Sequence, residues 1–382
     1  MRIAFLCKRR YMSKDVIVDR YARLYEIPYQ LARLGHEVRG YCLSYDRAEE
    51  GGWGHDATPG KLRWESRSLG RWKLPAVAGY PRHLLRRLRE FRPDVIIGAS
   101  DIPHVALGAW LAKRLGVPCA ADLYDNFEGF GQARIPGFVS ALRHAVRGAD
   151  LVTTTSQPLA DYVRDTYRAR GRIFAMPSTV DKAVFHPRDK LACRHALGLP
   201  ENARLIGTAG GLSRDKGIAT LYGAWDLLKD DRSDLHLVLA GPHQAGFPPP
   251  SGERVHYLGA LPHDRIAELF NALDVGIISV LDTPFGRYCF PQKAYEMLAC
   301  GLPVATADIG AMSDMFAGTP QCLFYAANAQ SLADCVRAQL ADPARPDISI
   351  DDWQALVSKL EPELLRVTRG LASPRAQLAR PP

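Results

Sequence analysis

Short apolar runs alternate with amphipathic segments along most of the chain. Residues 2–7 have the pattern of a buried strand, residues 21–34 repeat apolar side chains at helical spacing and end at Gly35, and residues 38–43 are again apolar. This succession of strand, helix and strand is the opening βαβ unit of a parallel sheet. No GxGxxG fingerprint follows the first strand, so a dinucleotide-binding dehydrogenase loses its main support.

The same alternation recurs further along the chain. Further strands are expected at residues 94–99, 117–122, 205–209, 255–258 and 303–306. Further helices are expected at residues 81–92, 218–228, 264–271 and 292–299. Residues 46–61, which are rich in glycine and charge, are instead expected to form a flexible loop facing a cleft between domains. The pattern predicts an α/β protein built from doubly wound sheets.

Length and composition limit the possible classes of protein. A chain of 382 residues is too long for one ordinary core and predicts two domains. The hydrophobic fraction of 47% is ordinary for a soluble protein, and no apolar run approaches the ~18 residues of a membrane span, so a cytoplasmic protein is expected. The 8 cysteines form no CxxC pair and no Cys/His cluster, which predicts reduced core residues rather than a zinc site or a disulfide framework.

Charge is distributed unevenly between the two halves. Residues 1–180 carry 29 Lys and Arg against 18 Asp and Glu, whereas residues 181–382 carry 20 against 23. The first half is therefore the one expected to meet an acidic partner, and no nucleic acid is expected. Within it, residues 81–92 place leucines on one helical face and arginines on the rest. This helix either packs on the sheet as an ordinary surface helix or rests on anionic lipid headgroups through Arg82, Arg86, Arg87 and Arg89.

Two stretches in the second half carry candidate chemistry. In RYCFPQKAYEMLACGLPVATADIGAMSD, residues 287–314, Pro291 starts a helix that would direct unpaired N–H groups toward an anion such as a diphosphate. Glu296 lies about one turn further in and could accept hydrogen bonds from sugar hydroxyls. In IGTAGGLSRDKGIATL, residues 206–221, a strand runs into paired glycines and then reaches Lys216. Glycines allow close approach to a phosphate and the lysine adds positive charge, so both stretches together predict a nucleoside diphosphate site.

These stretches resemble the donor half of the retaining nucleotide-sugar glycosyltransferases of the GT-B fold, the family 4-like and group 1 glycosyl transferases. In that family a strand, a Gly-rich turn and a Lys-Gly pair precede a helix, as GGLSRDKG does here. A motif of Glu, seven residues and Glu then precedes a Gly-x-Pro-Val strand. Glu296 corresponds to the second Glu, and Gly301, Pro303 and Val304 fit the strand. The similarity runs through most of the chain.

Two positions depart from the pattern of the family. Tyr288 stands where the family has its first Glu, which contacts the donor sugar. Gly211 stands where many members carry an arginine, and Arg214 lies near enough in sequence to substitute for it. The first departure leaves both full activity and the identity of the donor sugar open.

The resemblance implies a GT-B architecture of two Rossmann-like domains facing a cleft, with a C-terminal helix crossing back to the first domain. We expect the acceptor domain at residues 1–185, the donor domain at residues 186–350, crossover helices at 351–372 and a flexible tail at 373–382. The tail has too little apolar content to fold alone.

The resemblance also implies site residues. The donor-binding candidates are Gly210, Gly211, Arg214, Lys216, Tyr288, Phe290, Pro291, Lys293 and Glu296. Lys216 is also a catalytic candidate, because the negative charge that grows on a leaving diphosphate needs fixed positive partners. No Asp-x-Asp occurs in the chain, so we expect no metal, and no cofactor other than the nucleotide sugar as co-substrate.

Polar residues after the strand at 117–122 lie where open α/β sheets bind ligands. Asp122 and Asp125 are catalytic candidates on this acceptor side. The other acceptor-side candidates are His104, Tyr124, Asn126 and Glu128. For each of them an ordinary structural role, such as capping a helix, is the competing interpretation.

The expected function is a metal-independent retaining glycosyltransferase that moves a hexosyl group from a nucleotide-diphosphate sugar to a hydroxyl of a glycan, free or lipid-linked. The resemblance places this reaction in surface polysaccharide or lipopolysaccharide assembly, in the cytoplasm or peripherally on the inner membrane. Two alternatives stay open. Tyr288 suggests a catalytically weakened relative that still binds a nucleotide sugar, and a nucleotide-sugar epimerase can share the fold.

Overall fold

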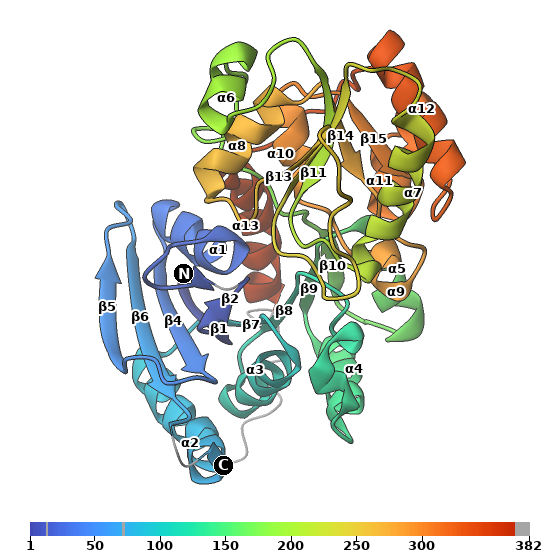
Figure 1. Ribbon diagram of the computed structural model, residues 1–382. Coiled ribbons are helices and arrows are strands. Elements are labelled where there is room, and N and C mark those ends of the chain that lie inside the picture. Colours follow the sequence, from blue (N-terminus) through green and yellow to red (C-terminus); the bar gives the residue numbers. More distant parts are fainter. Residues whose placement is uncertain (13, 71–72, 371–382) are drawn as a thin grey trace, which may run out of the picture. The chain divides into compact units, whose positions relative to one another are not determined.

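Two largely parallel sheets with a similar internal strand order organise the chain (Figure 1). The structure is a computed structural model that describes residues 1–12, 14–70 and 73–370. Met1–Ser178 and Trp353–Pro382 form unit 1, and Thr179–Asp352 form unit 2. The predicted donor domain lies within unit 2, and the predicted flexible tail lies outside the described residues.

Unit 1 is built on an 8-stranded sheet. In sheet order its strands are β10 (Arg172–Ala175), β9 (Leu151–Thr154), β8 (Cys119–Leu123), β7 (Val95–Ala99), β1 (Arg2–Lys8), β4 (Glu37–Ser44), β6 (Lys61–Ser68) and β5 (Gly51–His55). All neighbours are parallel except β5, which runs antiparallel to β6. A separate two-stranded antiparallel ribbon joins β2 (Arg10–Tyr11) to β3 (Lys14–Asp15).

Helices cover both faces of this sheet. They are α1 (Ala22–Arg33), α2 (Lys73–Phe91), α3 (Ile102–Leu115), α4 (Phe138–Gly148), α5 (Gln157–Thr166) and α13 (Trp353–Gly370), with short 3-10 turns at Phe127–Gly129 and Gly131–Arg134. On one face α1 and α13 pack together over β1, β4 and β6, burying Leu31, Leu360 and Leu364. His36 Nε2 also lies 2.8 Å from Glu361 Oε1. The C-terminal helix therefore belongs to unit 1, as the GT-B prediction requires.

The sheet edge formed by β5 and β6 corrects the prediction of a loop at residues 46–61. Trp53 pairs with Trp64, and both strands are regular. The prediction was wrong because three of the five residues of β5 are glycines, which hide the alternation by which a strand is recognised. α2 also begins earlier than predicted, so Pro81 lies inside it.

Unit 2 is built on a 6-stranded, fully parallel sheet. In sheet order its strands are β13 (Val255–Tyr257), β12 (Leu235–Ala240), β11 (Arg204–Ala209), β14 (Val275–Ile278), β15 (Val304–Ala307) and β16 (Leu323–Phe324). Its helices are α6 (Lys190–Leu197), α7 (Ile218–Leu228), α8 (His263–Ala272), α9 (Pro284–Tyr288), α10 (Lys293–Ala299), α11 (Ala311–Met315) and α12 (Ala329–Ala341), with 3-10 turns at Arg214–Lys216 and Pro320–Cys322.

Alternating side chains of the unit 2 strands enter two separate cores. Ile206 and Ile277 face α7 and α12, where Trp225 and Val336 complete the packing. Leu205 and its neighbours face the other way, toward α8 and α10. Strands buried on both faces read as continuous apolar runs, which explains why this half was predicted well.

Both sheets place the first strand of the series inside the sheet, with the strands that follow it (β4, β5 and β6 in unit 1, β12 and β13 in unit 2) on one side and the later strands on the other. The direction in which the sheet grows therefore reverses beside β1 in unit 1 and beside β11 in unit 2. Open α/β sheets bind ligands at the carboxyl ends of the strands at such switch points. The two switch points are the places to look for a site.

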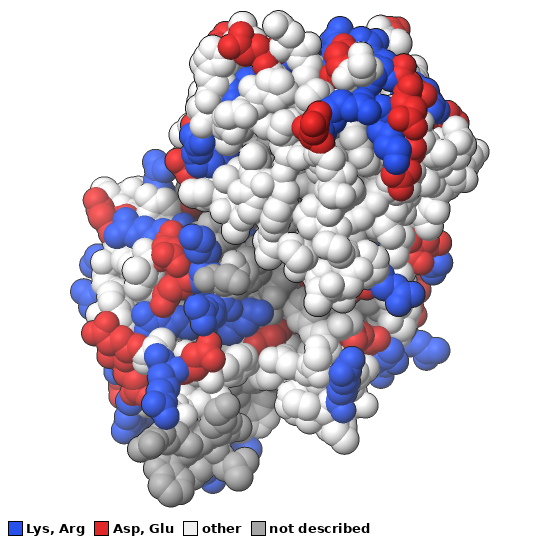
Figure 2. All heavy atoms as spheres, viewed as in Figure 1, with Lys and Arg blue, Asp and Glu red and all other residues white. Residues whose placement is uncertain are grey.

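The described residues also bear on what the composition predicted about cysteines, charge and membrane spans. All eight cysteines are buried and none of them forms a disulfide, as predicted. In the space-filling view, Lys and Arg gather around the β5–β6 edge of unit 1, interleaved with Asp and Glu (Figure 2). None of the helices in the described part of the chain is long and apolar enough to cross a bilayer.

Candidate functional site

β11 ends in a turn that requires glycine. Gly210 has a φ of 111°, in the region that favours glycine. A Cβ on Gly241, in the turn after β12, would lie 2.0 Å from the Gly210 carbonyl oxygen, so the two turns are in close contact. A Cβ on Gly210 would lie 3.8 Å from Lys293 Nζ. The predicted glycine turn therefore lies directly beside a lysine of α10.

The loop after this turn fixes Lys216 at the end of the neighbouring strand β14. A Cβ on Gly217 would lie 1.4 Å from the carbonyl oxygen of Ser279, so only glycine permits this approach. The Ser279 hydroxyl donates to the Lys216 carbonyl at 3.1 Å. Lys216 Nζ lies 4.7 Å from the centre of the Phe285 ring. The lysine backbone is thus held rigidly, while its half-buried side chain extends over an aromatic ring of α9.

Lys293 and Glu296, both half-buried on α10, complete a charged group with Lys216. Lys293 Nζ donates to Thr208 Oγ1 at 3.1 Å. Burial, and to a smaller extent the charge of Lys216, lower the pKa of Lys293 to about 7, while Glu296 opposes the shift. Burial raises the pKa of Glu296 to about 7, against the effect of Lys293 and of a hydrogen bond from Gln292. Lys216, Lys293 and Glu296, which we call the Lys–Glu cluster, therefore lie within electrostatic reach of one another.

The Lys–Glu cluster contains two lysines and only one carboxylate, so its positive charge is not fully compensated. Within the described part of the chain, no carboxylate forms an ion pair with Lys216 or Lys293. Because α10 has only seven residues, its dipole adds little to the field of the two lysines. The arrangement can bind a multiply charged anion, and Glu296 can accept hydrogen bonds from hydroxyl groups beside it.

The other donor-side predictions lie near this cluster, with different roles. Tyr288 ends α9, a short helix that the sequence did not predict, and a Cβ on Gly310 would lie 2.3 Å from the carbonyl oxygen of the preceding Arg287. Phe290 packs edge-on against Tyr295, with ring centres 4.8 Å apart, so it is a packing residue. Arg214 is exposed, and its backbone N–H donates to the Gln244 side chain.

Gly211 and Pro291 frame the cluster along the chain. Gly211 is exposed, and a Cβ there would meet nothing within 4 Å. Pro291 lies two residues before α10, and its carbonyl accepts from the Ala294 N–H at 2.8 Å. Neither position is fixed by a close contact of the kind found at Gly217.

On unit 1, the predicted catalytic residue Asp122 is already engaged. The Arg23 guanidinium donates to both Asp122 carboxylate oxygens, at 2.6 to 3.1 Å, and Thr153 donates to Oδ1 at 2.5 Å. Arg23 also donates to the Met176 carbonyl at 2.6 Å. Side-chain exposure is 0% for Arg23 and 2% for Asp122. This buried ion pair joins β8 to α1, and its geometry favours a structural role for Asp122.

The residues after β8 form a connected polar and aromatic network. Tyr124 accepts a hydrogen bond from Lys8 Nζ at 3.0 Å, and its ring packs against Phe127. Asn126 caps the 3-10 turn by accepting from the Glu128 N–H at 3.1 Å. Asp125 is half-buried, and its Oδ1 accepts from the Asn126 N–H at 2.7 Å. Asn126 thus has the capping role that was the competing interpretation.

Glu128 and His104 are also held by protein partners. Arg143 donates to Glu128 at 2.7 and 3.0 Å, and although burial acts in the other direction, these bonds hold the Glu128 pKa below its usual value. His104 Nδ1 lies 2.6 Å from Asp101 Oδ1, whose carboxylate also accepts from the Tyr45 hydroxyl. In the described structure, the buried His104 Nε2 has no hydrogen-bond partner. His104 therefore has one ring nitrogen that is not engaged by the described residues, whereas the Glu128 carboxylate is bound by Arg143.

Two family models match this chain in succession. A glycosyl transferase 4-like domain matches residues 22–179, and the glycosyl transferases group 1 model matches residues 203–342. The chain belongs to the glycosyltransferases of the GT-B fold.

Individual relatives agree with this membership. The D-inositol 3-phosphate glycosyltransferase of Stackebrandtia nassauensis is 30% identical over 230 residues, which cover 56% of this chain and 49% of that protein. The putative teichuronic acid biosynthesis glycosyltransferase TuaC of Bacillus subtilis is 22% identical over 309 residues, which cover 80% and 75%. The chain thus aligns with about half the length of the first relative and three quarters of the second.

Solved structures share the fold across nearly the whole chain. Sucrose-phosphate synthase from Thermosynechococcus elongatus superposes with a TM-score of 0.69 at 19% identity, covering 99% of this chain and 98% of that one. Anabaena HepE, solved in complex with UDP and glucose, superposes with a TM-score of 0.64 at 17% identity, covering 99% and 100%. These likenesses show that the GT-B fold was predicted correctly.

For this GT-B glycosyltransferase, the sequence missed the residues that support the site. Thr208 binds Lys293, Ser279 anchors Lys216 and Phe285 lies under its ammonium. Thr208 stands one residue before the end of β11 and two before the glycine pair, and that position was the available signal. Ser279 and Phe285 follow β14 in a segment without a recognisable motif.

Proposed function

We propose that the protein is a retaining glycosyltransferase that moves a sugar from a nucleoside diphosphate sugar to a hydroxyl of a glycan acceptor. The observation that carries this proposal is the Lys–Glu cluster, in which two lysines without a carboxylate partner lie beside the glycine turn of β11. A diphosphate supplies the negative charge that this arrangement lacks. Membership of the family supports the same reaction class.

In the proposed donor complex, Lys216 and Lys293 neutralise the diphosphate, and Glu296 accepts hydrogen bonds from the ribose hydroxyls. As the bond between the sugar and the diphosphate breaks, charge grows on the leaving oxygens, and the fixed ammonium of Lys216 stabilises it. The HepE structure was solved with UDP, which makes UDP the first nucleotide to test. Arg214, exposed and in the same turn as Lys216, is proposed to add charge when the donor is bound.

On the acceptor side, we propose that Asp125 and Tyr124 contact the acceptor, whereas Asp122 positions them through its ion pair with Arg23. His104, with its unpartnered Nε2, is a further acceptor-side group. The name of the TuaC relative supports an acceptor in a cell-surface polysaccharide. Lipopolysaccharide assembly, a lipid-linked acceptor and a cytoplasmic location belong to this proposal as its finer form.

The proposal includes a reaction without metal. The chain lacks Asp-x-Asp, and no group of three His, Cys, Asp or Glu side chains in the described residues could hold an ion. Turnover is therefore expected to be unchanged by EDTA, and loss of turnover that magnesium or manganese restores would contradict this part. Proton NMR of the first-formed product tests retention, since the new glycosidic bond should have the anomeric configuration of the donor.

A panel of radiolabelled nucleotide sugars, beginning with UDP-glucose, tests the whole proposal. Release of the nucleoside diphosphate that requires an added glycan acceptor supports transfer. Tyr288, at the position of a family carboxylate, specifically favours a second candidate, a weakened relative that binds a donor without turning it over. Binding of UDP without release from any donor would support that candidate, and an epimerised donor would show an epimerase instead.

A further part of the proposal is a peripheral contact with anionic membranes through α2. Arg82 and Arg89 are exposed on the outer face of this helix, as such a contact requires. Flotation with vesicles containing phosphatidylglycerol should carry the protein upward, and the Arg82→Gln/Arg89→Gln variant should float less. Equal flotation of both proteins would contradict the contact.

A further inference from the structure

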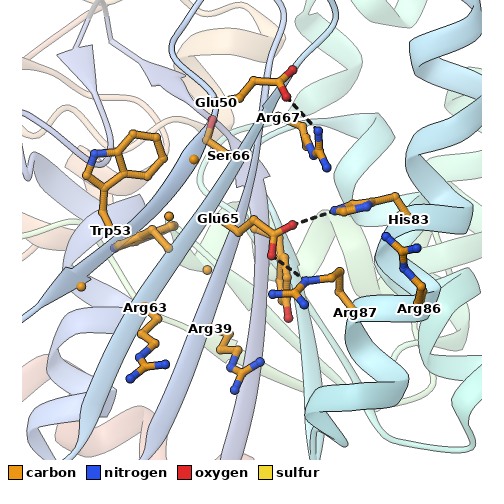
Figure 3. A pocket seen from close by; sticks show the side chains of 16 residues that line it. Arg39, Glu50, Trp53, Arg63, Glu65, Ser66, Arg67, His83, Arg86 and Arg87 are labelled. Atoms are coloured by element: carbon orange, nitrogen blue, oxygen red, sulfur yellow. Dashed lines mark hydrogen bonds and ion pairs between the residues drawn. The ribbon is translucent and has the colours of Figure 1, made fainter.

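Unit 1 contains a cavity that the proposed reaction does not use. It has a volume of about 890 Å³ and lies between β4, β5, β6 and α2 (Figure 3). It is at the edge of the sheet, away from the strand ends at the switch point of unit 1. A volume of this order accommodates a small ligand.

The strand register shows which side chains enter the cavity. Arg39 is paired with Arg63, and Tyr41 with Glu65, so these four residues lie on one face of β4 and β6. That face is turned toward α2, because Glu65 accepts hydrogen bonds from His83 Nε2 at 2.7 Å and from Arg87 Nε at 2.8 Å.

Positive charge in the cavity exceeds negative charge. Its lining contains the arginines Arg39, Arg63, Arg67, Arg86 and Arg87 and the carboxylates Glu50 and Glu65. Glu50 is paired with Arg67 at 2.9 Å, and Glu65 with Arg87. In the described part of the chain, Arg63 and Arg86 form no ion pair. At least two guanidinium groups thus have no counter-charge among the described residues. A phosphate monoester dianion carries the two negative charges that would neutralise them.

Two polar atoms inside the cavity wall also lack a well-formed hydrogen bond. They are the Tyr41 hydroxyl and Arg39 Nε, which are buried in the described structure, with Tyr41 2% exposed. The Arg39 guanidinium lies near the Tyr41 hydroxyl, and its terminal nitrogen pairs with Glu37 at 3.6 Å. A native protein rarely leaves such donors unpaired unless a ligand or water binds them. Burial raises the Tyr41 pKa to about 12, so the phenol is a hydrogen-bond donor at neutral pH.

Glycines keep the outer floor of the cavity open. Gly52 pairs with Glu65 and Gly54 with Arg63, so both lie on the face turned toward α2. A Cβ on Gly54 would meet nothing within 4 Å, and its φ lies outside the region that favours glycine. Any side chain fits at Gly54 without strain and would project into the free volume. The backbone of β5 therefore does not require glycine at position 54, and the glycine there leaves the cavity open.

We propose that this cavity binds the phosphate group of a small phosphorylated ligand, such as a phosphorylated sugar. Arginine is suited to this group because its planar fork donates two parallel hydrogen bonds to phosphate oxygens. A membrane is the less suitable occupant, because Arg39 is recessed, with 27% of its side chain exposed, and Arg87 is held inward by Glu65. Among the exposed arginines of α2, Arg86 lines the cavity, whereas Arg82 and Arg89 lie outside it.

Isothermal titration of the full chain with inorganic phosphate and with a hexose 6-phosphate, at low ionic strength, tests the proposal. The variant Arg63→Gln/Arg86→Gln should weaken binding at least about tenfold, since it removes two charge-assisted contacts. The matched variant Arg82→Gln/Arg89→Gln removes the same charge from the outer face of α2 and should change binding less than about twofold. Equal weakening by both variants would overturn the proposal, because it would show that the anion is attracted only by the overall positive potential of this surface.

Two further variants separate the cavity from other anion sites. Lys216→Ala leaves the cavity intact and should bind the hexose 6-phosphate as the wild type does; loss of binding would assign the signal to the Lys–Glu cluster and overturn the proposal. Gly54→Glu should abolish binding by repulsion without altering the thermal unfolding of the chain, while unchanged binding would overturn it. Vesicle flotation that depends on Arg63 and Arg86, without binding of either soluble probe, would also overturn it in favour of a lipid headgroup.

Discussion

The two switch points share a strand order but treat charge in opposite ways. In unit 1, the buried carboxylates near the strand ends have partners inside the protein: Asp122 is bound by Arg23, and Asp101 by His104 and Tyr45. In unit 2, the charge of Lys216 instead makes it less favourable for Lys293 to be protonated. Groups that are satisfied inside the protein stabilise a platform, whereas groups left unsatisfied are available to a ligand.

The largest effect that this comparison predicts comes from Lys216→Ala. Removing a fixed cation from the leaving diphosphate should reduce turnover of the nucleotide sugar by about 10²- to 10³-fold. The fold should persist, because the Lys216 contact with Ser279 is made by its backbone carbonyl. Initial rates of nucleoside diphosphate release measure the effect.

Lys229→Ala is the matched control for Lys216→Ala. Lys229 is a lysine of the same unit whose ammonium pairs with Asp226 near the surface, so its removal should leave turnover within about twofold. Equal rates for Lys216→Ala and the wild type would remove the contrast between the two switch points.

Much of unit 2 was predictable from sequence because its strands are short and apolar throughout. The helix at residues 218–228 was predicted with the bounds that the structure has, since glycine precedes it and its apolar spacing is regular. The Lys–Glu cluster could also be assembled, because a glycine pair, a lysine and a Pro-started helix are local signals. α9 escaped prediction, since five residues give no periodicity.

Unit 1 was less predictable at its site and at its edge. Arg23 and Asp122 are 99 positions apart, and nothing local to either residue indicates the partner that decides its role. The strand β5 was missed because its glycines carry no hydrophobic alternation, and the same glycines open the cavity. Ligand-binding features made by the absence of side chains are difficult to recognise in a single sequence.

The second prediction concerns the platform of unit 1. Asp122→Asn keeps the shape of the side chain but leaves the buried Arg23 guanidinium without a counter-charge, which should destabilise the chain by about 3 kcal/mol. Differential scanning calorimetry should show the loss as a lower Tm. In the double variant Arg23→Met/Asp122→Leu no charge is left buried, so part of the Tm should return. A Tm unchanged by Asp122→Asn would mean that Asp122 is not structural.

The third prediction is that removing a charged side chain in unit 2 stabilises the chain, whereas it destabilises the chain in unit 1. The Lys293 pKa is lower in the folded chain than the usual 10.5, so the unfolded chain binds more protons and this lysine destabilises the fold below about pH 10. Lys293→Met should therefore stabilise the chain at pH 7, by about 1 to 2 kcal/mol because the side chain is partly hydrated. The gain in Tm should shrink at pH 9, and Lys229→Met should give no such gain. A lower Tm for Lys293→Met at pH 7 would contradict the assignment.

The smallest effect is a change in proton binding when UDP enters the donor site. At pH 8 the free Lys293, with its pKa near 7, is mostly neutral, and a bound diphosphate should raise that pKa, so binding should take up a fraction of a proton. At pH 6 Lys293 is already charged, whereas Glu296 is mostly protonated and should release its proton as it accepts ribose hydrogen bonds. Titration calorimetry in buffers of different ionisation enthalpy should therefore show uptake at pH 8 and release at pH 6.

Variants of the Lys–Glu cluster assign the two directions of proton transfer to separate residues. Lys293→Met should remove the uptake at pH 8 while UDP still binds through Lys216, only more weakly. Glu296→Gln should reduce the release at pH 6 and leave the uptake at pH 8. In Asp122→Asn both should be unchanged, because unit 1 contributes no group to the proposed diphosphate contacts. Uptake at pH 8 that survives in Lys293→Met would show that the unsatisfied charge of unit 2 lies on some residue other than Lys293.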